Sequence, residues 1–249
     1  PDALKDFVFT DPAAWRLAKE KDKPALELHK QSAYKPEHRS PLNIALIADK
    51  VFGDFILEVE LLSTVKPYGH QDMCLFFGCQ DAAHLYYVHL GKKTDDHANQ
   101  IFIVNDAARV KISTKTTDGT NWDDAWHHVK IERNASTGDI KIFFDDMQEP
   151  VMTAVDKTFA WGQVGVGTFD DTGNFDNVFL FGTKAEPKEV AVADQQIRQR
   201  PAQQREHGDH LDLVAHDQPV RKEGRVGGDR THATTGVRVF AQHGKRIRS

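Results

Sequence analysis

The sequence has few residues that could cross-link it covalently. Only two cysteines occur among its 249 residues, and both lie in one apolar run, Met73-Cys74-Leu75-Phe76-Phe77-Gly78-Cys79. If that run is a strand, rising roughly 3.3 Å per residue, the two cysteines are about 16 Å apart and on opposite faces. A disulfide needs Cα atoms within about 7 Å of each other. The sequence therefore predicts two free thiols.

Long hydrophobic runs are also missing. No stretch approaches the roughly 18–20 apolar residues that a membrane-spanning helix needs, so no membrane span is expected. No secretory leader is visible, and the chain starts at Pro1 rather than at Met. We expect that a leader is not present in this chain, and that the protein is secreted or periplasmic.

Aromatic residues and positive charge are unevenly distributed. Of the 15 Phe, 4 Trp and 4 Tyr, only Phe240 lies beyond Gly182. Residues 1–182 contain 19 basic and 28 acidic residues, whereas residues 183–249 contain 13 and 9. An acidic main domain argues against nucleic acid as a partner, because phosphate binding needs clustered Lys and Arg.

This distribution predicts one folded domain at residues 1–182. Residues 183–249 have almost nothing to bury, and we expect a tail that is disordered or partly helical. The tail loses aromatic residues and gains Arg, Gln and His abruptly. This raises the hypothesis that it is a frame-shifted or read-through product that is not native to the domain.

Alternation of apolar and polar residues with a period of two dominates residues 1–182. It is clearest where Phe55, Leu57, Val59 and Leu61 alternate with Ile56, Glu58 and Glu60. Further strands are expected within residues 5–9, 24–29, 43–48, 71–79, 84–90, 99–105, 108–113, 128–132, 139–144, 150–155, 161–169 and 175–182. A short helical turn is expected near Asp11-Pro12, because Asp before Pro suits a helix start. The pattern predicts an all-β fold, an antiparallel β-sandwich or jelly roll.

Two stretches resemble a known superfamily. The first reads Trp126-His127-His128-Val129-Lys130-Ile131-Glu132 and continues through Gly138-Asp139-Ile140-Lys141-Ile142-Phe143-Phe144. The second reads Gly162-Gln163-Val164-Gly165-Val166-Gly167 and continues to Leu180. Both are similar to strands of concanavalin A-like and laminin-G-like jelly rolls. With residues 52–60, the chain is most similar to the 3-keto-disaccharide hydrolase-like family. The resemblance covers about residues 50–182, and it implies a jelly-roll fold and a carbohydrate ligand.

Residues that suit sugars concentrate between Tyr68 and Arg109. Aromatic faces pack against sugar C–H groups, and planar polar groups bind hydroxyls. We expect neighbouring strands to bring these residues to one polar groove. The expected substrate-binding residues are Tyr68, Tyr86, Tyr87, Lys92, His97, Asn99, Gln100, Asn105 and Arg109.

Glycoside hydrolysis needs two carboxylates that flank the bond, about 5–5.5 Å apart for retention and about 6.5–9.5 Å for inversion. Glu58 and Glu60 share a strand face at a spacing of about 6.6 Å, although alternating Glu is also typical of any solvated strand. The Glu-x-Asp-x-x-Glu arrangement of jelly-roll glucanases is absent. Asp72, beside His70, is the other candidate acid or base. The expected catalytic residues are His70, Asp72, His89, Glu58 and Glu60.

A glycoside hydrolase acting on a poly- or oligosaccharide is the function that we expect first. A non-catalytic carbohydrate-binding or adhesion module is the alternative. A polysaccharide lyase is the second alternative, but its Gln-Ile-His signature is missing because Phe102 follows Gln100-Ile101. An enzyme should show titratable groups in a deep cleft, and a binding module should show a shallow aromatic platform.

Oxygen ligands are frequent in the segment from Asp170 to Asp176. Asp170, Asp171, Asn174 and Asp176 are the residues expected to hold a structural Ca²⁺, which prefers oxygen ligands. A turn rich in Asp and Asn is also common without any ion. The sequence shows no Cys/His spacing of a zinc site, and it predicts no other cofactor.

Overall fold

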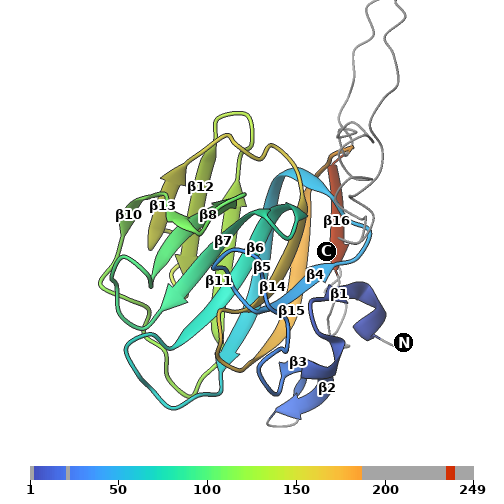
Figure 1. Cartoon of the computed structure of the whole chain (residues 1–249), viewed down its shortest axis with the longest axis vertical. Coiled ribbons are helices and arrows are strands. Elements are labelled where there is room, and N and C mark those ends of the chain that lie inside the picture. The colour runs from blue at the N-terminus through green and yellow to red at the C-terminus, as the bar shows by residue number, and fades with distance from the viewer. Residues whose placement is uncertain (1–2, 21–22, 187–233, 239–249) are drawn as a thin grey trace, which may run out of the picture. The chain divides into compact units, whose positions relative to one another are not determined.

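The computed structural model describes residues 3–20, 23–186 and 234–238. These residues form two antiparallel sheets packed face to face, as predicted (Figure 1). One sheet has seven strands in the order β1-β4-β14-β6-β7-β8-β9. The other has nine strands, in the order β10-β13-β12-β11-β5-β15-β3-β2, with β16 also paired to β15.

Apart from β2, β10 and β16, the strands follow the predicted ranges closely. The seven-stranded sheet consists of β1 (Phe7–Phe9), β4 (Asn43–Ile47), β14 (Gln163–Thr168), β6 (Asp72–Asp81), β7 (His84–Gly91), β8 (Gln100–Asn105) and β9 (Val110–Lys111). The nine-stranded sheet consists of β10 (Ser113–Thr116), β13 (Met152–Val155), β12 (Asp139–Phe144), β11 (His127–Arg133), β5 (Phe52–Ser63), β15 (Gly173–Lys184), β3 (Lys23–Leu28), β2 (Trp15–Glu20) and β16 (Thr234–Arg238). Two 3-10 helices, η1 (Ala3–Asp6) and η2 (Pro12–Ala14), precede β1 and β2.

The start of the chain shows one confirmed prediction and one missed strand. The expected helical turn is η2, and the Asp11 side chain caps it by accepting a hydrogen bond of 3.0 Å from the backbone N–H of Ala13. Strand β2 follows directly but was not predicted. Its side chains do not alternate between buried and exposed positions, so the sequence has no period of two there.

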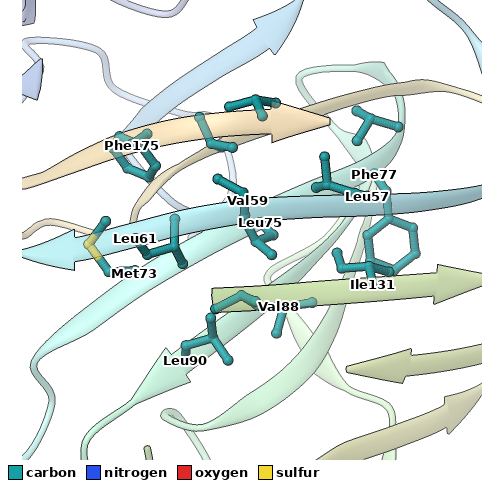
Figure 2. Packing of buried hydrophobic residues seen from close by; sticks show 14 of the residues in the cluster. Leu57, Val59, Leu61, Met73, Leu75, Phe77, Val88, Leu90, Ile131 and Phe175 are labelled. Carbon is teal, nitrogen blue, oxygen red and sulfur yellow. The ribbon is translucent and has the colours of Figure 1, made fainter. Parts of the chain in front are cut away.

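The main core lies between the two sheets. Along β5, the side chains of Phe55, Leu57, Val59 and Leu61 are buried, as their alternation predicted. Figure 2 shows that β5 contributes Leu57, Val59 and Leu61 to the same packed layer as Phe175 of β15 and Leu75 and Phe77 of β6. This core fixes which side of each sheet faces outward.

A bulge in β6 corrects one expectation about the cysteines. Cys74 and Cys79 are free thiols, and both belong to one apolar cluster rather than to opposite faces of the sheet. The pairing of β6 with β14 shifts register between Phe76 and Cys79, where three steps along β6 match two along β14, and Gly78 has φ +59°. Because the bulge adds one residue, every side chain beyond it changes face.

Both thiols should resist modification in the folded protein. The two side chains are buried, and burial raises the pKa of Cys74 and of Cys79. Because the thiolate is the reactive form, we expect slow reaction with a thiol reagent in native buffer and rapid reaction of both cysteines in denaturant. Counting modified thiols by mass spectrometry checks this, and rapid labelling of either cysteine in native buffer would contradict the burial.

Five loops gather at one end of the sandwich, because strand pairs that end there are neighbours. Asp72 pairs with Gly91, Asn43 with Thr168, and Gly173 with both Leu28 and Ser63. Loops 29–42, 64–71, 92–99, 117–126 and 169–172 therefore emerge together. We call this region the loop end.

The C-terminal side of the domain extends beyond the expected boundary at Gly182. Strand β15 continues to Lys184, and its residues Phe179 to Thr183 pair with β16. Apart from β16, which is a strand, nearly all of the predicted tail lies outside the described residues, so its disorder and its origin stay predictions. Within the described part of the chain, no helix is long and apolar enough to cross a membrane.

Candidate functional site

Three carboxylates converge at the loop end. Asp72 begins β6, and Asp170 and Asp171 follow β14, which is the neighbour of β6 in the sheet. One oxygen of each carboxylate lies within 4.8 Å of the other two. We call Asp72, Asp170 and Asp171 the carboxylate cluster.

Hydrogen bonds hold two of these carboxylates in place. Asp171 accepts the hydroxyl of Tyr68 at 2.7 Å on Oδ1 and the backbone N–H of Asp72 at 2.9 Å on Oδ2. Asp72 Oδ2 accepts the backbone N–H of Phe169 at 2.6 Å and the thiol of Cys74 at 3.2 Å. Asp72 Oδ1 is buried and accepts no hydrogen bond from the described residues.

The electrostatics of the carboxylate cluster favour a cation. Asp72 is only 1% exposed, and this burial raises its pKa to about 7, with Asp171 and Asp170 adding to the shift. Burial also raises the pKa of Asp171. Carboxylates this close cannot all ionise cheaply unless a positive charge lies between them.

Only some of the residues predicted to hold Ca²⁺ lie together in the structure. Asp170 and Asp171 belong to the predicted set, and Asp72 joins them with a buried oxygen that has no protein donor. All three offer the oxygen ligands that Ca²⁺ prefers. Asn174 and Asp176 lie further along β15, whose Asp176 forms an ion pair with Lys23, so the structure separates them from the other two.

Exposed side chains lie in the same group of loops as the carboxylate cluster. Tyr68 is 44% exposed, while its hydroxyl is fixed by Asp171. His70 is exposed, and its Nε2 lies 2.6 Å from Asp95 Oδ2. Asp95 also accepts the backbone N–H of exposed His97 at 2.6 Å. Burial opposes ionisation of Asp95, but these hydrogen bonds outweigh it and lower its pKa.

Tyr87 and His89 lie in a covered cluster rather than in an open groove. Tyr87 is fully buried, and its hydroxyl accepts a hydrogen bond of 2.7 Å from the Arg109 guanidinium. That guanidinium lies 4.4 Å from the centre of the Phe169 ring, which also packs against His89. Burial lowers the pKa of His89 to about 3, so its imidazole is neutral at neutral pH.

The remaining predicted binding residues have other contacts. Tyr86 points between the sheets and bonds to Asp156, and Asn105 is exposed at the opposite end from the loops. Lys92 donates to the Trp122 carbonyl at 2.7 Å. Gln100 donates to the Asp95 carbonyl at 3.0 Å and Asn99 to Thr94 at 2.7 Å, which hold loop 92–99, and Asn99 also donates to the Thr117 carbonyl at 3.1 Å, which joins this loop to loop 117–126.

Glu58 and Glu60 lie on the other sheet, on the outer face of β5. Glu58 Oε2 is 3.1 Å from His128 Nε2. Glu60 bonds to Lys23 and accepts the Asn177 side-chain amide at 2.7 Å. Burial raises the pKa of Glu60, but these two hydrogen bonds outweigh the effect and leave it lowered.

The five expected catalytic residues are therefore not brought together. His70 and Asp72 belong to the loop end, His89 lies in the covered cluster, and the two glutamates belong to the opposite sheet. Asp95 was not among the expected binding or catalytic residues, although its side chain accepts the backbone N–H groups of His97 and Ala98, as in an Asp turn. That turn chemistry was the one available signal.

No family model and no curated protein matches this chain. Among solved structures, it is similar to the carbohydrate-binding module CBM66 from Bacillus subtilis, with a TM-score of 0.50 and 20% sequence identity, over 70% of this chain and 93% of that one. It is also similar to domain 4 of AbnA, an extracellular arabinanase from Geobacillus stearothermophilus, in complex with arabinotriose, with a TM-score of 0.42 and 9% identity, over 70% of this chain and 77% of that one. The first of these likenesses shows the fold, an antiparallel β-sandwich.

Proposed function

We propose that this domain is a carbohydrate-binding module that uses the loop end, with a Ca²⁺ ion held by the carboxylate cluster. The observation that carries the proposal is the carboxylate cluster itself, because its Asp171 also anchors the exposed ring of Tyr68. An aromatic face next to fixed oxygen acceptors is the combination that sugar rings require. The fold shared with CBM66 supports a saccharide as the ligand.

The positions of the candidate catalytic carboxylates favour sugar binding over hydrolysis. A general acid must come within about 2.6–3.2 Å of the atom that it protonates. Asp72 is 1% exposed, so a glycosidic oxygen cannot reach it in this arrangement. The two glutamates are on the other sheet. Hydrolysis, lyase activity and membership of the 3-keto-disaccharide hydrolase-like family stay predictions of the sequence.

Different residues of the loop end would make different contacts with a bound sugar. Tyr68 presents its ring to the C–H face of a sugar, while Asp170 and His70 are exposed and accept or donate hydrogen bonds to hydroxyls. A bound Ca²⁺ would supply the positive charge that lets Asp72, Asp170 and Asp171 ionise together. Extracellular modules bind Ca²⁺ with Kd values of about 10⁻⁴–10⁻³ M, which fits the proposed secretion.

A titration series tests this proposal. We expect at least one neutral oligosaccharide from a plant and algal panel to bind in calcium buffer and to bind about tenfold more weakly in EDTA. Tyr68→Ala should weaken binding by about tenfold, because it removes the stacking face. Isothermal titration calorimetry measures both effects, and reducing-sugar release in the same samples detects hydrolysis.

The matched control is Phe181→Ala, because Phe181 of β15 is 41% exposed, close to the 44% of Tyr68. This control should bind as the unchanged protein does. Unchanged affinity of Tyr68→Ala would remove the loop end as the site, and release of reducing sugar would show an enzyme instead.

A further inference from the structure

A second group of polar residues lies on the outer face of the nine-stranded sheet, where β15 runs beside β5. Asp176 is paired with Glu60 and Asn174 with Leu62. Phe175 between them points into the core and is fully buried. Because successive side chains of a strand point to opposite faces, Asn174 and Asp176 point outward on the same face as Glu60. We call Glu60, Asn174 and Asp176 the β15 acceptor group.

Two members of the acceptor group, Asn174 and Asp176, are buried without enough donors. Asn174 is 3% exposed and Asp176 is 1% exposed. Within residues 3–20 and 23–186, no donor forms a hydrogen bond to Asn174 Oδ1 or to Asp176 Oδ1, whereas Asp176 Oδ2 forms an ion pair with the Lys23 ammonium at 3.2 Å. Buried polar atoms in folded proteins almost always have a partner. Two unpartnered acceptors on one strand face, beside a carboxylate oxygen that only the Lys23 ammonium is seen to neutralise, therefore indicate a place for a molecule that donates hydrogen bonds.

Lys23 and Trp126 complete the surroundings of this group. The Lys23 ammonium bonds to Glu60, lies 3.2 Å from Asp176 Oδ2, and lies 4.3 Å from the centre of the Trp126 ring. Its side chain is 30% exposed, and Trp126 is partly exposed. A lysine side chain has a flexible four-carbon stem, so Lys23 is the one part of this arrangement that moves aside easily.

We propose that Trp126 and the β15 acceptor group form a second saccharide-binding site, which the Lys23 side chain fills when no ligand is bound. When Lys23 moves aside, it uncovers the two carboxylates that it contacts, and a sugar ring stacked on Trp126 would donate its hydroxyls to Asp176 and Glu60. This site is separate from the loop end, because it uses the outer face of the opposite sheet.

The charges of the site indicate which sugars it prefers. Two carboxylates, Glu60 and Asp176, share the single ammonium of Lys23. When Lys23 moves aside, a ligand that carries its own ammonium restores the lost ion pair and also contacts the Trp126 ring as a cation. Amino sugars should therefore bind more tightly than neutral sugars of the same shape.

Two trisaccharides that differ at one substituent test the proposal. The probes are the fully deacetylated glucosamine trimer and cellotriose, which carry an ammonium and a hydroxyl, respectively, at C2. We expect the glucosamine trimer to bind about tenfold more tightly at this site, and Trp126→Ala to weaken its binding by about tenfold. Calorimetry gives the affinity and the stoichiometry, and a thermal melt of each variant shows that it is folded.

Trp161→Ala is the matched control, since Trp161 is also partly exposed and precedes β14 rather than β11. It leaves the net charge unchanged, as Trp126→Ala does, so non-specific attraction of the trimer to an acidic domain affects both equally. Equal affinity of the two tryptophan variants would overturn the proposal.

Two further variants separate this site from the loop end. Lys23→Met removes the competing ammonium but keeps most of the stem, and it should bind the glucosamine trimer about tenfold more tightly; unchanged or weaker binding would overturn the role of Lys23. Tyr68→Ala should leave binding of the trimer at the Trp126 site unchanged. If Tyr68→Ala abolishes all binding of the trimer and Trp126→Ala does not weaken it, the second site does not exist. If only Trp126→Ala weakens binding of the trimer, the second site is supported, even where the loop end binds no sugar.

Discussion

Replacing Asp72 with Asn is expected to raise the free energy of unfolding of the calcium-free domain at about pH 8, by up to about 4 kcal/mol. The pKa of Asp72 is about 7 in the fold, against 3.8 for a free side chain. A carboxyl whose pKa is raised on folding contributes its full stability below the unfolded pKa, and this contribution is lost as the pH rises towards the folded pKa. Asn is neutral throughout, so the variant does not lose it.

The difference in stability between Asp72→Asn and the unchanged protein should depend on pH and on calcium. At about pH 3, below the ordinary pKa of 3.8, the two proteins should have nearly equal stability, because Asp72 is largely protonated in both the folded and the unfolded state. A ligand that binds only the folded state stabilises that state against unfolding. Calcium should therefore stabilise the unchanged protein, and it should not stabilise the variant, which lacks the Asp72 carboxylate. Urea unfolding in EDTA and in calcium, at both pH values, measures this. Asp170→Asn is the control, because it removes a neighbouring carboxylate that is exposed. If Asp72→Asn is less stable than the unchanged protein at about pH 8 in EDTA, the raised pKa of Asp72 is contradicted.

Trp122→Ala is expected to lower the free energy of unfolding by about 3–5 kcal/mol, the usual cost of truncating a large buried aromatic side chain. The Trp122 side chain is 1% exposed and meets the rings of His127 and Phe144 edge to face, at 5.3 and 5.1 Å between ring centres. Its indole N–H donates to the Leu90 carbonyl at 2.8 Å. The substitution therefore leaves both a cavity and an acceptor without a donor.

Trp126→Ala provides the comparison for this prediction. Trp126 is partly exposed, and its removal should change the free energy of unfolding by no more than about 1 kcal/mol. Chemical denaturation followed by far-ultraviolet circular dichroism gives both values. Equal losses in the two variants would show that Trp122 is not a core residue.

The sequence predicted the sandwich because burial on one face imposes a period of two. Strands such as β5 and β11 have this period and were placed to within two residues of their true ends. The period is absent from β2, where Arg16 and Leu17 are both exposed, and the expected strand 108–113 contains β9 but only the first residue of β10. Local alternation cannot reveal a strand that sits at the edge of a sheet with little to bury.

The candidate site was predictable only in parts, because it depends on contacts between distant segments. Asp170 and Asp171 were expected as ligands and Asp72 as an acid, but nothing local indicates that β14 lies beside β6 and joins the three. In the same way, the sequence shows that Tyr87 and His89 are suited to sugars. It does not show that Phe169 and Arg109 cover them.

The bonds from Asn99 have a consequence for the thermodynamics of binding. The backbone of Asn99 adopts φ +54°, and its buried amide group joins loop 92–99 to Thr117 in loop 117–126. Loops tied in this way have already lost much of their conformational entropy before a ligand arrives. Binding at the loop end then does not have to order them, and more of the contact energy appears as affinity. Selectivity follows as well, because a rigid surface cannot rearrange to fit a sugar of a different shape.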